Sequence, residues 1–287
     1  MLRIDPARCL DPLTLSVLQD FDAVATNQGV SYFVCGAMAR DILAWHVHGV
    51  PVPRATLDVD LAFSVSDWAA FHTLKSILRD KHGYLLDTDN PWKVRLPGPA
   101  GTPGYRVDLI PFGGIEAPAG EFAWPPDSEI IMNVLGFNDA LGSACTVTVA
   151  RDLEIPVVSL PMLAILKLLA WNNRRQHSVK DARDFAFLLT TYERMGVTAR
   201  LYDMEPEILA AVDYHLDLAG ARLLGKDAAR AVTPVTKQVV VPLLGNATAR
   251  ASLITEIATS IRGRDDVVGV ASSFLQQFEF GLTERNG

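Results

Sequence analysis

The hydrophobic pattern of this 287-residue chain changes once along its length, and that change limits the possible architectures. Up to about residue 155, short β-branched and aromatic runs alternate with segments of helical spacing, which indicates strands and helices packed together. After Ser159 the apolar segments have the spacing of helices. The sequence therefore predicts an α+β protein with two domains, an α/β domain over residues 1–155 and a helical domain over residues 156–287.

Composition excludes several classes of protein. The chain has 33 acidic and 26 basic side chains and a formal net charge of −7, which argues against a protein that coats nucleic acid by bulk charge but allows a local basic patch. Its three cysteines are far apart and odd in number, so packed thiols are expected rather than disulfides or a zinc site. We find no signal peptide and no segment apolar enough to span a bilayer, so we expect a cytoplasmic protein without a membrane partner.

Two aspartates on one predicted strand carry the clearest chemical signal. Residues 57–63 alternate between apolar and other side chains, so Asp58 and Asp60 lie on the same face of a strand. Neighbouring carboxylates repel each other unless they are protonated or bridged by a cation, and Mg²⁺ prefers oxygen ligands. By itself, this pattern is usually a solvated strand face.

A third carboxylate and a glycine extend this signal. Asp108 lies on another predicted strand with the same alternation, and the three carboxylates converge if the two strands are neighbours. Such a set can hold two Mg²⁺ ions for the in-line displacement of a phosphoryl group. Gly36 lies between a predicted strand and a predicted helix, where its backbone and the N–H group of Ala37 can approach a phosphate. The sequence therefore predicts a triphosphate site beside a metal site.

The segments FVCGAMARDIL (33–43) and RATLDVDLAF (54–63) resemble the nucleotidyltransferase superfamily that includes DNA polymerase β. Its motif is Gly-Gly or Gly-Ser after the first strand, then Asp-x-Asp, then a third Asp, and it implies a mixed-sheet catalytic domain. Ala37 stands where a serine often contacts the triphosphate, so the resemblance leaves the backbone amides and Arg40 as phosphate ligands. Arg40-Asp41 is similar to the Gly-Gly-x-x-Arg-Asp element of CCA-adding enzymes.

The second half of the chain sharpens the resemblance. LPMLAILKLLAW (160–171) and RRQHSVKDARDFAFLL (174–189) are similar to the AbiEii-type nucleotidyltransferase toxins of bacterial type IV toxin–antitoxin systems. This resemblance implies catalytic roles for Lys167 and Asp184 and nucleotide-binding roles for Lys167 and Lys180. It also implies an RNA acceptor such as the 3′ end of tRNA, and a separately encoded antitoxin.

The same residues also allow structural interpretations. The carbon stem of Lys167 can cross an apolar helix surface and leave its ammonium group in water. Asp181 and Asp184 can form purely structural ion pairs with a neighbouring arginine. Basic residues surround these positions and are a candidate RNA-contact patch, although such a run is also typical of a solvated helix face; they are Lys167, Arg174, Arg175, Lys180 and Arg183, with His177 between them.

The sequence thus predicts a toxin that transfers a nucleoside monophosphate from an NTP to an acceptor hydroxyl and releases pyrophosphate, with Mg²⁺ or Mn²⁺ as cofactor. Asp58 and Asp60 bridge the metals, and Asp108 completes the site and helps to deprotonate the acceptor. Trp92 and Trp124 are candidates for stacking on a base. Two alternatives stay open: a hydroxyl-bearing, aminoglycoside-like antibiotic as acceptor, and a non-catalytic nucleotide-binding regulatory module on the same fold.

Overall fold

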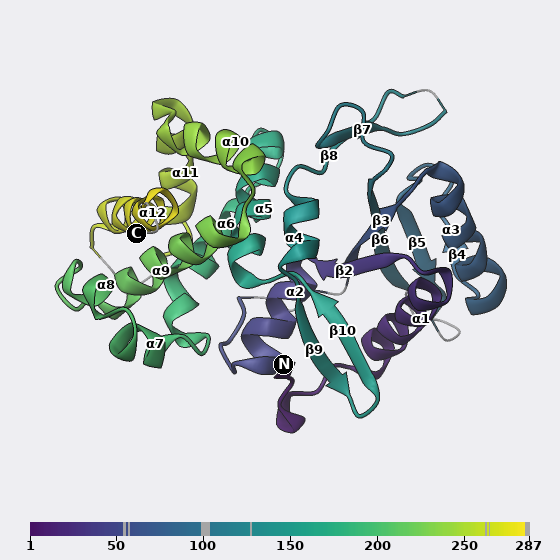
Figure 1. Cartoon of the computed structure of the whole chain (residues 1–287), viewed down its shortest axis with the longest axis horizontal. Coiled ribbons are helices and arrows are strands. Elements are labelled where there is room, and N and C mark those ends of the chain that lie inside the picture. The colour runs from purple at the N-terminus through teal and green to yellow at the C-terminus, as the bar shows by residue number, and fades with distance from the viewer. Residues whose placement is uncertain are drawn as a thin grey trace. The chain divides into compact units, whose positions relative to one another are not determined.

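The computed structural model describes residues 1–53, 56, 58–98, 104–126, 128–261, 263 and 265–284 (Figure 1). The chain divides into two compact units, a sheet unit over Met1–Ser159 and a helical unit over Leu160–Gly287. The expected boundary after residue 155 falls inside a strand, β10 (Leu153–Val157), which hydrogen-bonds within the sheet. An α+β fold with a mixed sheet followed by helices is the architecture that the sequence predicts.

The sheet unit is built on an eight-stranded sheet with the order β1-β9-β10-β2-β3-β6-β5-β4 in the described residues. Neighbouring strands β3 and β6 are parallel, whereas β2 and β5 flank them antiparallel. A separate two-stranded sheet pairs β7 with β8. The strands are β1 (Leu2–Arg3), β2 (Ser31–Cys35), β3 (Asp58–Val65), β4 (Leu85–Leu86), β5 (Lys93–Leu96), β6 (Tyr105–Gly113), β7 (Glu121–Ala123), β8 (Ile131–Asn133), β9 (Cys145–Ala150) and β10.

Capping residues mark the two ends of the first helix of the sheet unit, α1. Asp11 accepts hydrogen bonds from the first N–H groups of α1, and Gly29 ends that helix in the left-handed conformation. The helix α2 follows β2 directly and continues as the π-helix η2, whose first half is buried. The helices are α1 (Pro12–Gln28), α2 (Gly36–Asp41), η2 (Ile42–Val47), α3 (Trp68–His82) and α4 (Phe137–Gly142), with a short 3-10 turn, η1 (Pro6–Arg8).

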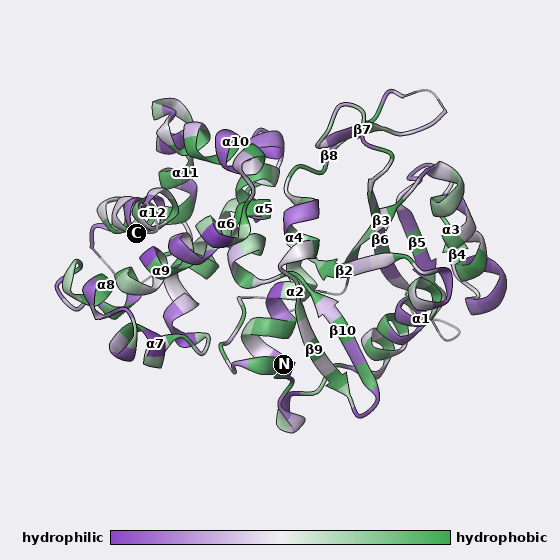
Figure 2. Ribbon diagram, in the orientation of Figure 1, coloured by the Kyte–Doolittle hydropathy of each residue, from purple (hydrophilic) through white to green (hydrophobic). Residues whose placement is uncertain are grey.

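The helical unit packs amphipathic helices, whose ribbons carry both hydrophobic and hydrophilic residues (Figure 2). α9 and α12 approach closely because Gly225 and Gly281 lie where a Cβ atom would come within 2.0 Å of a backbone oxygen on the facing helix. No described helix is both long and apolar enough to cross a membrane. The helices are α5 (Leu160–Arg174), α6 (Lys180–Thr191), η3 (Tyr192–Arg194), α7 (Thr198–Asp203), α8 (Pro206–Ala210), α9 (Leu216–Ala231), α10 (Pro234–Gly245), α11 (Ala247–Ala258) and α12 (Val267–Thr283).

Candidate active site

The predicted carboxylates of the sheet unit lie on adjacent strands. In the parallel pair of β3 and β6, Asp60 is the direct partner of Asp108. Cys35 on β2 is the partner of Asp60 on its other side, and Lys93 on β5 is the partner of Asp108. Directly opposite residues present their side chains on the same face of a sheet. Cys35, Asp60, Asp108 and Lys93 therefore form one row across four strands, and Asp58 lies on the same face two residues before Asp60.

Gly36 lies against the carboxylate of Asp60. It directly follows β2 and has φ +64°, which L side chains rarely adopt. A Cβ atom at this position would lie 1.7 Å from Oδ2 and 2.6 Å from Cγ of Asp60. The predicted phosphate-binding residues Gly36 and Ala37 thus begin α2 beside Asp60. The close approach of the Asp60 carboxylate leaves no room for a side chain at position 36.

Burial differs among the three aspartates. Asp58 is exposed, and its Oδ1 accepts a hydrogen bond of 2.5 Å from the hydroxyl of Thr56. Asp60 and Asp108 are half-buried. Burial raises the pKa of Asp108, whereas the positive charge of Lys93 opposes that rise. The row therefore contains one carboxyl group whose affinity for a proton is above its ordinary value.

The donor set suits a hard divalent cation that is shared with a substrate. In the described part of the chain, no three His, Cys, Asp or Glu side chains form a metal cage of their own. Mg²⁺ usually keeps several waters and is bound by one or two carboxylates together with substrate phosphates. Asp58 and Asp60 offer that arrangement next to the start of α2, and Asp108 adds an adjacent oxygen donor.

Arg40, which the sequence analysis expects to be a phosphate ligand, is buried beside Asp41. Its side chain is 1% exposed, and its Nε and Nη2 atoms lie 2.8 and 2.6 Å from Oδ1 of Asp41. In this conformation the guanidinium faces Asp41, and the contact between Arg40 and a triphosphate stays a prediction.

In the helical unit, Lys167 is enclosed by acidic side chains. Its Nζ lies 2.7 Å from Oδ2 of Asp184 and 3.3 Å from Oδ1 of Asp181, and both aspartates are buried. Arg174 contacts the other oxygen of Asp181 at 2.8 Å. The Lys167 side chain is 11% exposed, so its ammonium group is held by carboxylates rather than extended into water. Asp181 does form the ion pair with an arginine that the structural interpretation proposed.

Basic side chains near this cluster in the sequence are mostly exposed: Arg174, His177, Lys180 and Arg183. Arg175 is half-buried, and its guanidinium carbon lies 5.2 Å from the ring centroid of Trp171. These exposed charges belong to the part of α5 and α6 that carries Lys167 and its partners.

The two candidate stacking residues differ in access. Trp124 is 2% exposed and packs 5.7 Å from Trp92, centroid to centroid, so its ring belongs to the core. Trp92 is half-buried and directly precedes Lys93. Base stacking by Trp124 is therefore excluded in this conformation.

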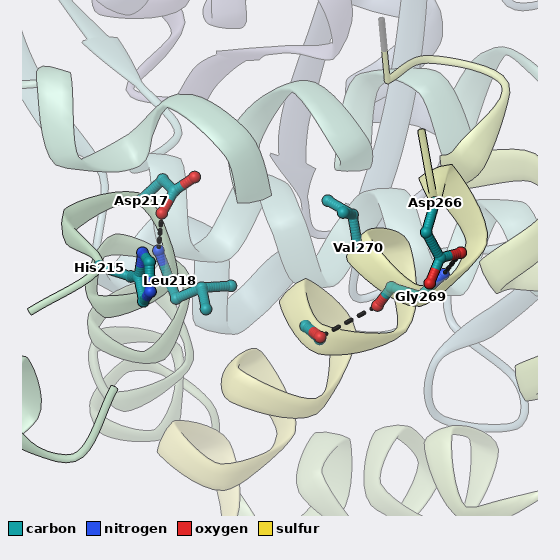
Figure 3. A pocket seen from close by; sticks show the side chains of 7 residues that line it. His215, Asp217, Leu218, Asp266, Gly269 and Val270 are labelled. Carbon is teal, nitrogen blue, oxygen red and sulfur yellow. Dashed lines mark hydrogen bonds between the residues drawn. The ribbon is translucent and has the colours of Figure 1, made fainter. Parts of the chain in front are cut away.

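A cavity of about 360 Å³ lies in the helical unit near the starts of α9 and α12 (Figure 3). Asp266 caps α12 by accepting from the N–H of Gly269, whereas Asp217 lies in the first turn of α9 and accepts from the N–H of Leu218. None of the predicted site residues lines it. The lining residues are His215, Asp217, Leu218, Asp266, Gly269, Val270 and Ser273.

Comparison with known proteins adds an independent line of evidence. Residues 22–238 match the family model described as "Nucleotidyl transferase AbiEii toxin, Type IV TA system". The chain belongs to the AbiEii family. It is therefore a nucleotidyltransferase, and the AbiEii match includes both the aspartate row and the Lys167 cluster. No curated protein matches the sequence.

One solved structure similar to this AbiEii-family chain is that of an antigenic nucleotidyltransferase-like protein from Paracoccidioides brasiliensis. The two sequences are 16% identical, the TM-score is 0.43, and the alignment covers 72% of this chain and 94% of the Paracoccidioides protein. Another is the antibiotic-resistance factor ANT(2'')-Ia, with 16% identity and a TM-score of 0.38 over 72% of this chain and 98% of that one.

Sequence reasoning about this AbiEii-family enzyme missed two residues that lie beside the predicted aspartates. Lys93 belongs to the row only because β5 pairs with β6, and strand order is not visible in the sequence. Thr56 directly contacts Asp58, and its position two residues before an acidic strand was the available signal.

Proposed function

We propose that this AbiEii-family nucleotidyltransferase transfers a nucleoside monophosphate from an NTP to a hydroxyl of RNA, such as the 3′ end of tRNA, and acts as the toxin of a toxin–antitoxin pair in the cytoplasm. One observation carries the catalytic part: Asp60 and Asp108 are direct partners on adjacent strands, with Gly36 against the Asp60 carboxylate. This juxtaposition puts phosphate-binding backbone beside metal-binding oxygens.

Asp58, Asp60 and Asp108 are the residues that would hold Mg²⁺ or Mn²⁺. A bound divalent ion supplies charge neutralisation to the triphosphate and to the oxygens that exchange in the transfer. The N–H groups of Gly36 and Ala37 bind phosphate oxygens at the start of α2. Because no serine follows Gly36, these backbone donors replace the hydroxyl that related motifs offer.

The proposed reaction is a single displacement at the α-phosphorus of the NTP. The acceptor oxygen forms a bond to the α-phosphorus, the bond from that phosphorus to the β-phosphate oxygen breaks, and pyrophosphate leaves. The hydroxyl proton passes to the carboxylate of Asp108.

The helical unit is proposed to bind the acceptor. Lys167, whose side chain is 11% exposed, offers a partly accessible ammonium group to phosphate, and Asp184 and Asp181 hold that group in one place. The exposed Arg174, Lys180 and Arg183 support an RNA acceptor, since local basic charge attracts the backbone of RNA to a protein whose overall charge is negative.

The decisive experiment incubates the protein with each labelled NTP and total cellular RNA, followed by separation by size. Wild-type protein should label RNA, and Asp60→Asn should lower the rate by more than about 10²-fold because the metal loses a charged ligand. Asp152→Asn, in the exposed turn between β9 and β10, is the matched control. Full activity of Asp60→Asn would refute the mechanism.

The acceptor and the toxin role have separate readouts. A parallel reaction with aminoglycosides tests the antibiotic alternative, which a labelled small molecule would support. Induced expression in bacteria should stop growth with the wild-type protein and not with Asp60→Asn. Unimpaired growth with active enzyme would argue against the toxin role, and rescue by a co-expressed neighbouring gene would identify the antitoxin.

A further inference from the structure

A continuous set of side-chain interactions runs from the interior of α2 to the exposed Asp58. Arg40 donates to Oδ1 of Asp41, whose Oδ2 accepts the backbone N–H of Thr56 at 3.1 Å. The Thr56 hydroxyl then donates to Oδ1 of Asp58 at 2.5 Å. Each link has its own donor and acceptor, so the set extends without a break to a proposed metal ligand.

The first link is buried. Arg40 is 1% exposed and Asp41 is 5% exposed. Two charges removed from water carry a desolvation penalty, and such a pair is weak evidence for a stabilising role. The pair here instead has a directional consequence: the guanidinium occupies one oxygen of Asp41, and the other oxygen faces the backbone of Thr56.

The second link lies just before β3. Thr56 is half-buried, and it is joined to Asp41 through its backbone and to Asp58 through its side chain. A solvent-exposed aspartate samples several rotamers, whereas a hydrogen bond from a fixed hydroxyl favours one of them. Thr56 thereby ties the carboxylate at the start of β3 to the core of the sheet unit.

The helix α2 therefore lies against one aspartate of the Asp-x-Asp pair and is linked to the other through Thr56. Its first residue, Gly36, lies against the carboxylate of Asp60. Its last residue, Asp41, reaches Asp58 through Thr56. One short helix is thus connected to both carboxylates.

We propose that Arg40, Asp41 and Thr56 are positioning residues that hold the Asp58 carboxylate in its metal-binding orientation. Arg40 thereby acts through Asp41 and Thr56 and does not touch the nucleotide. The inference rests on the proposed function for its catalytic consequence, but the orientation of Asp58 can be measured in metal-free protein.

The test compares Thr56→Val, which removes the hydroxyl at nearly constant volume, with Thr56→Ser, which keeps it. Thr56→Val should raise the half-saturating Mn²⁺ concentration for NTP incorporation by about tenfold, in the range found when a partner of a metal ligand is lost. Thr56→Ser should restore the wild-type requirement to within about twofold. Equal Mn²⁺ requirements for Thr56→Val and wild type would overturn the proposal.

Asp41→Asn tests whether the upstream pair acts through Thr56. Alone, it should raise the Mn²⁺ requirement, and in the Thr56→Val background it should add little, because residues of one chain of interactions are not additive. Fully additive effects would show that Asp41 acts by another route and would contradict the proposal. If Asp41→Asn does not fold, the Thr56 pair decides alone.

Crystal structures of metal-free wild type, Thr56→Val and Thr56→Ser separate the inference from the function. The Asp58 carboxylate should leave its position in Thr56→Val and keep it in Thr56→Ser. An unmoved carboxylate in Thr56→Val would refute the positioning role even if the enzyme is active. If the wild type bound neither Mn²⁺ nor NTP, the proposed function would be refuted. The three metal-free crystal structures would still decide whether Thr56 positions Asp58.

Discussion

Replacing Gly36 by alanine should strongly lower activity, and Gly29 provides a control for the backbone effect. The two glycines have almost the same backbone angle, with φ of +64° at Gly36 and +63° at Gly29. A left-handed conformation costs a residue with a side chain roughly 1–2 kcal/mol, so both Gly→Ala variants should lose about that much stability. They differ in what the new methyl group meets.

Nothing lies within 4 Å of a Cβ atom built at Gly29, whereas one at Gly36 would lie 1.7 Å from Oδ2 of Asp60. The Asp60 oxygen would have to retreat by at least about 1.3 Å to restore a separation of 3.0 Å. A misplacement of about 1 Å in a catalytic group can cost about 10²-fold in rate. Gly36→Ala should therefore lower kcat/KM by about 10²-fold or more, and Gly29→Ala by less than about twofold.

The assay measures incorporation of labelled NMP and, separately, urea unfolding of wild type and both variants. The expected result is a similar loss of stability in the two variants and a loss of activity in Gly36→Ala alone. If Gly36→Ala is as active as Gly29→Ala, the Asp60 carboxylate can move without consequence, and its close approach to α2 is not part of the catalytic geometry.

Three further outcomes are expected. Lys167→Met should lower the free energy of unfolding by about 3–5 kcal/mol, because it removes the cation from buried Asp184 and leaves buried Asp181 with Arg174 alone. Lys180→Met at an exposed site should change it by less than about 0.5 kcal/mol; urea unfolding tests both. Burial raises the pKa of Glu193 from 4.5 to about 7. The free energy of unfolding should therefore fall by roughly 3 kcal/mol as pH rises from below 4.5 to above 7. Glu193→Gln should remove this pH dependence, and an unchanged pH profile in that variant would contradict the prediction. Neutralising Arg174 and Arg183 together should raise the KM for RNA and weaken its salt dependence while leaving the KM for NTP within about twofold. An unchanged KM for RNA would exclude these two residues as acceptor contacts.

The sequence predicted the positions that local periodicity controls. The alternation of β3 puts Val59 and Leu61 in the core and Asp58 and Asp60 on the opposite face, as expected from a period of two. A capping aspartate and a terminal glycine likewise marked the two ends of α1. These features depend on a few consecutive residues, so they could be predicted without a fold.

Side-chain direction in the interior could not be predicted in the same way. The resemblance to nucleotidyltransferases implied that Arg40 binds the triphosphate. In the structure, the guanidinium of Arg40 forms an ion pair with the buried carboxylate of Asp41. Which of two possible partners an arginine takes depends on burial, and burial depends on residues that are distant in the sequence.

The sequence by itself determined the change from an α/β half to a helical half, the pair of aspartates on one strand face and the glycine between a strand and a helix. Only the tertiary structure decided that β3 lies between β2 and β6, and it thereby placed Asp108 beside Asp60 and Lys93 beside Asp108. The reason is physical: periodicity is set by backbone geometry within a segment, whereas strand order is set by how distant segments share one core.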